Sequence, residues 1–126
     1  MKIERVLIVD DSNADLFLSE LVIKKHDKNI EIQTAYNGRE ALEILDSLDV
    51  QPDIIFLDIN MPEMNGHEFL EIYNQRTDQT SVVIMLTSSD QKIDIEKATA
   101  YDCVKHFFTK PLDEDDLKML ALENFS

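Results

Sequence analysis

Two hydrophobic patterns alternate along the chain. Short, nearly continuous runs of β-branched and aliphatic residues predict strands that are buried within a sheet. After each run, apolar residues recur at the spacing of one face of a helix. The predicted strands are residues 5–9, 54–57, 82–86 and 104–109, together with residues 30–35, which alternate like a less buried strand.

Helix signals follow each of these runs. Ser12 and Asn13 can cap the first helix, and Asn37-Gly38 precedes the second. The last predicted helix, roughly residues 114–123, has acidic residues in its first turn, where the helix dipole favours them. The apolar residues that define the other helices are Ala14, Phe17, Leu18, Leu21 and Val22, then Ala41, Leu42, Leu45 and Leu48, then Phe69, Leu70, Ile72 and Tyr73, then Ile95 and Ala98.

The regular alternation of strand and helix predicts an α/β fold with a parallel sheet, right-handed crossovers and helices on both faces. A chain of 126 residues is too short for a closed eight-stranded barrel. We therefore predict a doubly wound open sheet of five strands with five helices. No linker or composition break interrupts the pattern, so residues 1–126 are expected to form a single domain, with no effector domain visible.

The composition narrows the range of functions. Apolar residues make up 44% of the chain and the longest apolar runs are only a few residues, so no membrane span is expected. The formal net charge of −14 repels nucleic-acid phosphates and anionic lipids, which argues against binding to either. The N-terminus carries no export signal, so a cytoplasmic location is predicted. Cys103 is the single cysteine and has no disulfide partner within the chain.

In a doubly wound sheet, ligands bind outside the carboxyl ends of the strands. Asp10 and Asp11 follow the first predicted strand, Asp58 the third, and Lys110 the fifth, while Thr87 opens the polar stretch 87–90 after the fourth. Three converging carboxylates repel one another unless a cation is present, and oxygen ligands suit Mg²⁺, with Mn²⁺ as the other candidate ion. A lysine ammonium and a threonine hydroxyl suit a phosphoryl group beside that ion.

An Asp carboxylate can itself attack phosphorus and form an aspartyl phosphate. Asp58 is the best placed nucleophile because the acidic pair and the lysine are expected on either side of it. The alternative interpretation is structural, since an acidic residue or a threonine after a strand is often only a helix cap, and Lys110 could simply be solvated. The complete set at alternate strand ends favours the phosphoryl site.

These residues resemble the receiver domain of two-component response regulators, and the resemblance covers essentially the whole chain. It implies a flavodoxin-like, CheY-like fold and a Mg²⁺-dependent switch that accepts a phosphoryl group from a sensor histidine kinase or a histidine phosphotransfer protein. The motifs that carry it are Val9-Asp10-Asp11-Ser12, Leu57-Asp58-Ile59-Asn60-Met61-Pro62-Glu63-Met64-Asn65-Gly66, Leu86-Thr87-Ser88 and Lys110-Pro111.

The resemblance also implies roles for individual residues. Asp58 would accept the phosphoryl group, and Lys110 would pair with it. Asp11, Asp58 and the backbone carbonyl of Asn60 would bind the metal directly, with Asp10 acting through water. The bond before Pro111 would be cis, which would aim the lysine into the site.

Two further features concern signal output. Thr87 would be the switch hydroxyl, and the aromatic residue three positions before the lysine, here Phe107, would turn inward on activation; ordinary core packing is the alternative for Phe107. The family often has Gly-Ala before the fifth strand, where this chain has Asp102-Cys103, so the turn there is expected to differ.

An inward turn of Phe107 would change the surface formed by the fourth helix, fifth strand and fifth helix, and we predict that a downstream protein binds there. His26, His67 and His106 have no partner at metal or catalytic-triad spacing, so we interpret them as surface or packing residues and expect the phosphorylated histidine on the partner.

Two other functions compete with this interpretation. The first is a haloacid-dehalogenase-like phosphohydrolase, an enzyme that needs a second Asp two residues after the nucleophile, where this chain has Asn60. The second is a degenerate receiver that serves only as a binding module, which the presence of both acidic-pair residues, Asp58 and Lys110 argues against. We therefore predict a phosphoacceptor switch rather than an enzyme.

Overall fold

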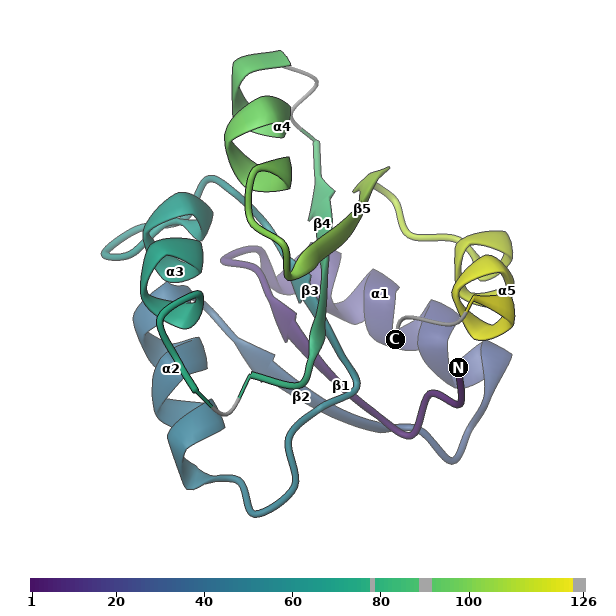
Figure 1. Cartoon of the computed structure of the whole chain (residues 1–126). Helices are drawn as coiled ribbons and strands as arrows, with labels where there is room; N and C mark the ends of the chain where they lie inside the picture. Colours follow the sequence, from purple (N-terminus) through teal and green to yellow (C-terminus); the bar gives the residue numbers. More distant parts are fainter. Residues whose placement is uncertain (78, 89–91, 124–126) are drawn as a thin grey trace.

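Five parallel strands form a single sheet in the order β2-β1-β3-β4-β5 (Figure 1). The computed structural model describes residues 1–77, 79–88 and 92–123. Because β1 lies between β2 and β3, the strand order reverses there, which is where doubly wound sheets bind ligands. The strands are β1 (Arg5–Val9), β2 (Glu31–Ala35), β3 (Ile54–Leu57), β4 (Val82–Thr87) and β5 (Val104–Thr109).

Each strand is followed by a helix, as the sequence predicts. Figure 1 shows α2 and α3 on one side of the sheet and α1 and α5 on the other, with α4 standing beside the ends of β4 and β5. The N-terminus lies beside the end of the last helix, where the amino group of Met1 donates to the backbone oxygens of Ala121 and Glu123. The helices are α1 (Asn13–His26), α2 (Gly38–Ser47), α3 (Gly66–Tyr73), α4 (Lys92–Thr99) and α5 (Glu114–Leu122).

The central strands β1, β3 and β4 are largely buried, whereas the edge strands β2 and β5 are partly exposed. Successive side chains point to opposite sides of the sheet, so each central strand packs against both helix layers. Leu7 and Val9 of β1 pack in the layer under α2, α3 and α4, whereas Val6 and Ile8 pack under α1 and α5. The doubly wound α/β class predicted from the sequence is therefore confirmed. None of the helices in the described parts of the chain is long and apolar enough to cross a bilayer.

Local capping fixes where the helices begin. The side chain of Ser12 accepts a hydrogen bond from the backbone of Asp15, and Asn37 does the same at the start of α2. The cap at Ser12 was predicted, and Asn37 belongs to the Asn37-Gly38 pair that was predicted to precede the second helix. Reciprocal capping boxes start α3 at Asn65 and α5 at Asp113, which satisfies backbone donors that a helix leaves unpaired.

The apolar residues that predict α1 do not form its buried face. Phe17, Leu18 and Leu21 are 60%, 49% and 52% exposed, and the helix instead buries Leu16, Ser19 and Ile23. Apolar residues lie on both sides of α1, so the sequence pattern cannot tell which side faces the sheet. The prediction of a helix was right, but the face was set by packing against the sheet and α5.

Candidate functional site

Asp10 and Asp58 lie side by side at the carboxyl edge of the sheet because β1 and β3 are paired strands. The backbone N–H of Asp58 donates to the carbonyl of Val9 over 3.0 Å, and that of Asp10 donates to Ala35 over 2.9 Å. The parallel ladder therefore continues one residue beyond each strand. This register places the two side chains at the point where the strand order reverses.

The acidic cluster predicted from the sequence is assembled in the structure. Asp10, Asp11 and Asp58 each offer a carboxylate oxygen within 4.8 Å of the others. Asp10 and Asp58 are buried, whereas Asp11 is exposed. Three hard oxygen donors, one of them open to solvent, fit a small divalent cation that keeps part of its hydration shell. Asn60 is exposed two residues after Asp58, and its carbonyl remains a predicted ligand.

Lys110 directly follows the carboxyl end of β5 and contacts the acidic cluster with its side chain. Its Nζ lies 2.5 Å from Asp10 Oδ2, 2.9 Å from Asp15 Oδ2 and 3.0 Å from Asp58 Oδ2. The peptide bond between Lys110 and Pro111 is cis, as the sequence predicts. The lysine thus joins the carboxylates that follow β1 and β3 to the first turn of α1.

Burial and hydrogen bonding shift the pKa values of Asp10 and Lys110 in opposite directions. Burial raises the pKa of the Asp10 carboxyl above its ordinary value, although hydrogen bonds from Lys110 and from the backbone of Ser12 lower it. Burial alone would lower the pKa of Lys110, but its hydrogen bonds to Asp10, Asp15 and Asp58 raise it overall. Lys110 is therefore a permanent cation at neutral pH.

The two oxygens of Asp58 have different partners. Oδ1 accepts a hydrogen bond from the backbone N–H of Ile59 over 2.8 Å, and Oδ2 accepts from Lys110 over 3.0 Å. These bonds hold the carboxylate in one orientation. Asp58 therefore presents a fixed oxygen pair to the metal side and the lysine side of the crevice.

Two glycines hold the loop between β3 and α3 against the site. Gly66 donates to Ile59 over 2.8 Å, and an added Cβ would come within 2.4 Å of the backbone oxygen of Asp58. Gly38 donates to Met64 over 2.8 Å from the start of α2. Glu63, in the same loop, has a φ of 64°. A side chain at position 66 would displace the backbone of Asp58.

Thr87 is the last residue of β4 and is fully buried. Its carbonyl accepts the backbone N–H of Lys110 over 3.0 Å, so the two predicted site residues sit on adjacent strand ends. Ser89 and Asp90, from the polar stretch predicted after this strand, lie outside the described residues. The switch role of Thr87 remains a prediction.

Phe107 is half-buried and pairs with Met85 across β4 and β5. It packs against the hydrophobic layer under α2, α3 and α4, a position compatible with both core packing and a switch. Nearby, Cys103 is buried, and the pairing of β4 with β5 shifts register at Val83 and Ile84. The turn at Asp102-Cys103, where the family often has Gly-Ala, therefore lies outside the acidic site.

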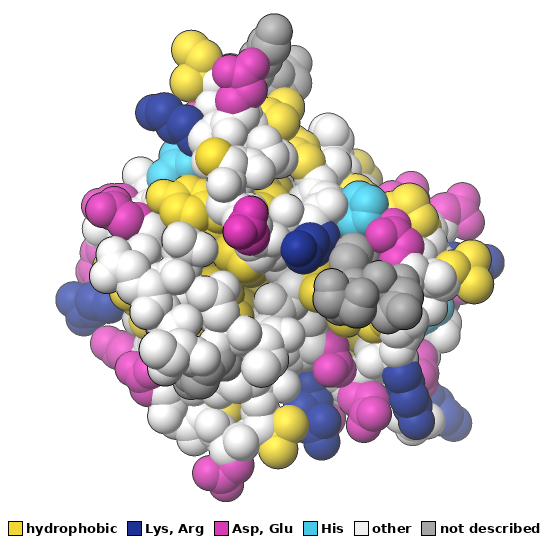
Figure 2. All heavy atoms as spheres, viewed as in Figure 1, with side chains coloured by type: hydrophobic (Ala, Val, Ile, Leu, Met, Phe, Trp, Pro, Cys, Tyr) yellow, Lys and Arg dark blue, Asp and Glu magenta, His cyan; other side chains and the backbone are white. Residues whose placement is uncertain are grey.

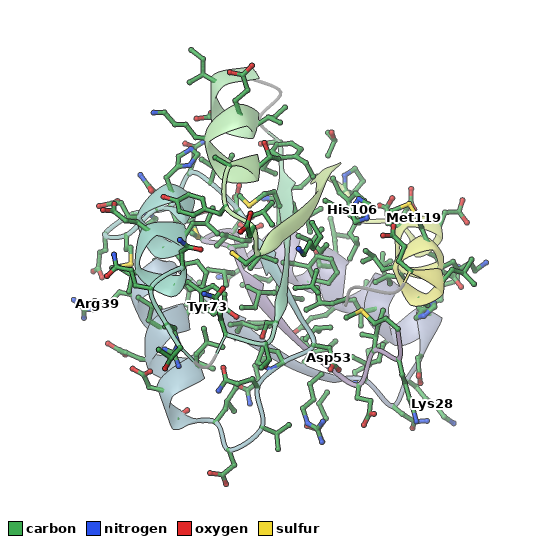
Figure 3. All side chains as sticks on the ribbon, in the orientation of Figure 1. Lys28, Arg39, Asp53, Tyr73, His106 and Met119 are labelled. Carbon is green, nitrogen blue, oxygen red and sulfur yellow. The ribbon has the colours of Figure 1, made fainter. Side chains whose placement is uncertain are left out.

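Sequence reasoning missed Asp15, which supplies the third carboxylate to Lys110. Its place early in the first helix was visible, but its distance from Lys110 depends on the fold. The histidine interpretation was incomplete as well. His67 Nε2 lies 3.2 Å from Asp94 of α4, and His106 Nε2 lies 2.6 Å from Glu123. Figure 3 shows His106 on the side of the molecule that carries α5 and Met119.

Charge outside the site is dispersed. Figure 2 shows acidic side chains scattered around the viewed face rather than gathered into one patch. At the opposite edge of the sheet, Asp53 caps the start of β1 by accepting the backbone N–H groups of Glu4 and Arg5 (Figure 3). Within the described residues, the acidic group with metal-ligand geometry is the one at the carboxyl edge.

Known proteins resemble this chain in sequence and structure. The profile of the response regulator receiver domain matches residues 6–121. Protein PilG of Pseudomonas aeruginosa is 32% identical, over 90% of this chain and 81% of its own length. A protein-glutamate methylesterase/protein-glutamine glutaminase of Bacillus subtilis is 38% identical, over 94% of this chain and 32% of its own length. A two-component response regulator from Cytophaga hutchinsonii superposes with a TM-score of 0.84 and 35% identity, over 96% of both chains.

The match to longer relatives is partial. This chain spans 24% to 32% of the length of the first curated relatives it matches, which include the methylesterase. The activity in that enzyme's name therefore describes a protein most of which lies outside the matched region. The region that all these proteins share with this chain is the receiver domain. With a profile match over residues 6–121 and a CheY-like flavodoxin fold, the chain belongs to the receiver domain family of two-component response regulators.

Proposed function

We propose that this receiver accepts a phosphoryl group on Asp58, with Mg²⁺ bound, from a sensor histidine kinase or a histidine phosphotransfer protein in the cytoplasm. Mn²⁺ is the other ion that the same oxygen ligands suit. The observation that carries the proposal is the position of Asp58 between the acidic pair and Lys110.

The transfer follows from this arrangement. An oxygen of Asp58 attacks phosphorus, the bond from phosphorus to the donor histidine breaks, and the electron pair returns to the imidazole. Lys110 donates to the oxygens around Asp58 and offsets their charge as the phosphoryl group arrives. Asp11, Asp58 and the backbone carbonyl of Asn60 would hold the ion directly, and Asp10 would act through water. The ion, when bound, neutralises charge on the phosphoryl oxygens.

Thr87 and Phe107 are the proposed readers of the phosphoryl group. Thr87 ends the strand between β3 and β5, so its hydroxyl is on the same edge as Asp58. A hydrogen bond from that hydroxyl to the phosphoryl group would draw Thr87 toward Asp58 and open space beside β4. Phe107, half-buried on the neighbouring strand, is placed to fill that space. The surface formed by α4, β5 and α5 would change, and a downstream protein would bind there.

The competing functions have less support. The receiver profile covers most of the chain, and Asn60 stands where a phosphohydrolase needs its second Asp. A receiver that is only a binding module has no need of the assembled set of Asp10, Asp11, Asp58 and Lys110. The proposal is therefore a phosphoacceptor switch that acts on no separate substrate.

The test is phosphorylation by a small donor. Incubation with acetyl phosphate and Mg²⁺ should add one phosphoryl group, detected by intact mass. Asp58→Asn should abolish labelling, whereas Glu20→Gln, in the middle of α1, should be labelled like the parent. Equal labelling of the Asp58→Asn protein would overturn the assignment, and an unlabelled parent would favour the binding-module alternative.

A second experiment separates the reader from the acceptor. Thr87→Ala should keep most of the phosphorylation of Asp58, because it removes neither the nucleophile nor a metal ligand. The amide chemical shifts of residues 92–123 should respond to beryllofluoride in the parent and much less in Thr87→Ala. The reading mechanism fails if both proteins show the same full set of shifts, or if the parent shows none beyond the metal site.

A further inference from the structure

The Lys110 ammonium donates to carboxylates from three separate elements. Asp10 follows β1, Asp58 follows β3, and Asp15 lies in the first turn of α1. An ammonium group has three hydrogens, so these partners use its whole donor capacity. A phosphoryl oxygen can bind this lysine only if one of the present partners gives way.

The three partners differ in how easily they can be released. The side chains of Asp10 and Asp58 are 5% and 9% exposed, whereas that of Asp15 is 39% exposed. In the resting protein, either buried carboxylate would be left unpaired in a poorly solvated place if it lost its cation, which is costly. Water can solvate Asp15 as soon as the lysine leaves it. Asp15 is therefore the partner that Lys110 can exchange.

Asp15 is also unnecessary for holding the lysine in place. Without it, Lys110 would still donate to Asp10 and Asp58 and would have one hydrogen free for a phosphoryl oxygen. Asp15 adds a fourth carboxylate beside the acidic cluster of Asp10, Asp11 and Asp58, served by the single lysine Lys110. An incoming anion is repelled by each of them.

We propose that Asp15 is a positioning residue that competes with the phosphoryl group for the Lys110 ammonium. It restrains phosphorylation in the resting protein and gives up the lysine when Asp58 is phosphorylated. The first turn of α1 then loses its tie to β5, beside the small hollow lined by Leu18, Pro111 and Leu112. This inference rests on the proposed function and adds a regulator of the same site.

The first test measures affinity in charge-matched variants. Beryllofluoride, with Mg²⁺ at a fixed saturating concentration, is titrated into the parent, Asp15→Asn, Asp15→Glu and Glu20→Gln, and binding is measured by calorimetry. Asp15→Asn should bind about threefold to tenfold more tightly, because one nearby negative charge is removed and one lysine hydrogen is freed. Asp15→Glu, which keeps the charge, and Glu20→Gln should bind like the parent.

A second measurement reports the lysine contact directly. In the parent, the side-chain carboxyl carbon of Asp15 should shift toward the value of a solvated aspartate when Mg²⁺ and beryllofluoride are added together. Mg²⁺ alone should leave that resonance in place. A purely structural role for Asp15 would produce neither this shift nor tighter binding in Asp15→Asn.

The outcomes separate the two proposals. If the parent neither binds beryllofluoride nor becomes labelled by acetyl phosphate, the proposed function fails. If the parent does both, but Asp15→Asn binds no more tightly or the Asp15 carbon does not move, competition for Lys110 is wrong and the proposed function stands.

Discussion

Helices α1 and α5, on one face of the sheet, bury more of their apolar side chains than α4 does on the other face. On the first face, α1 buries Leu16 and Ile23 and α5 buries Leu117 and Leu120. Among the side chains of α4 that the structure describes, only Ala98 is buried, and Ile93 is 66% exposed. α1 and α5 thus bury several large aliphatic side chains, whereas α4 buries the methyl group of Ala98 fully and Ile95 only in part.

The difference shows where this fold can change shape at low free-energy cost. Local opening is easiest where few apolar side chains are buried, and buried area sets most of the cost. α4 is the next helix in the chain after Thr87, and its contact with α3 includes the pair His67 and Asp94. The element that is easiest to displace therefore adjoins the residue proposed to read the phosphoryl group.

The largest expected effect compares the two helix layers directly. Leu117→Ala, at a fully buried position of α5, should lower the free energy of unfolding by about 3 kcal/mol. Ile95→Ala, at a half-buried position of α4, should lower the free energy of unfolding by only about 1 kcal/mol, because this side chain buries less apolar surface when the protein folds. Urea unfolding measures both. Equal losses would show that α4 is held as firmly as α5.

Magnesium should stabilise the carboxyl edge without fixing α4. A ligand that binds only the folded state at about one hundred times its Kd adds about 2.7 kcal/mol, and the ion also relieves carboxylate repulsion. The melting temperature should rise with millimolar Mg²⁺ in the parent and much less in Asp11→Ala. Hydrogen exchange should slow mainly around Asp10 and Asp58. The absence of any rise in the parent would count against the metal site.

The smallest expected effect concerns helix caps, which should not distinguish the two faces. Asn65→Ala and Asp113→Ala each remove a capping box, one on each face, and each should cost about 1 kcal/mol. Urea denaturation would compare them. Similar losses would show that capping contributes equally on the two faces, so the looser attachment of α4 would be a matter of its packing. A much smaller loss at Asn65 would show that the cap of α3 contributes little.

The fold was predictable because its signals are local. The strands at 5–9, 54–57 and 104–109 agree with the structure, and the fourth extends one residue further than predicted, to Thr87. The second begins one residue later, at Glu31, and the last helix ends one residue earlier, at Leu122. The buried side of α1 was not predictable, because apolar residues occur on both of its sides.

The site was predictable where it depends on strand ends and not where it depends on distant contacts. Parallel strands bring Asp10 and Asp58 to one edge whatever the details of packing. The bond from Asp15 to Lys110 joins residues 95 positions apart and depends on the placement of α1 relative to β5. The pairs that His67 and His106 make with carboxylates arise in the same way, since no sequence spacing encodes them.

The strand order β2-β1-β3-β4-β5 also bears on how the molecule is assembled as it leaves the ribosome. Every strand after the first pairs with a strand already synthesised, so the sheet can grow by addition at its edges. Asp10, Asp11 and Asp58 come together once β3 is in place, but Lys110 arrives only after β5. The nascent domain therefore carries an uncompensated acidic edge until its last strand docks, and free divalent cations would stabilise that partly built sheet.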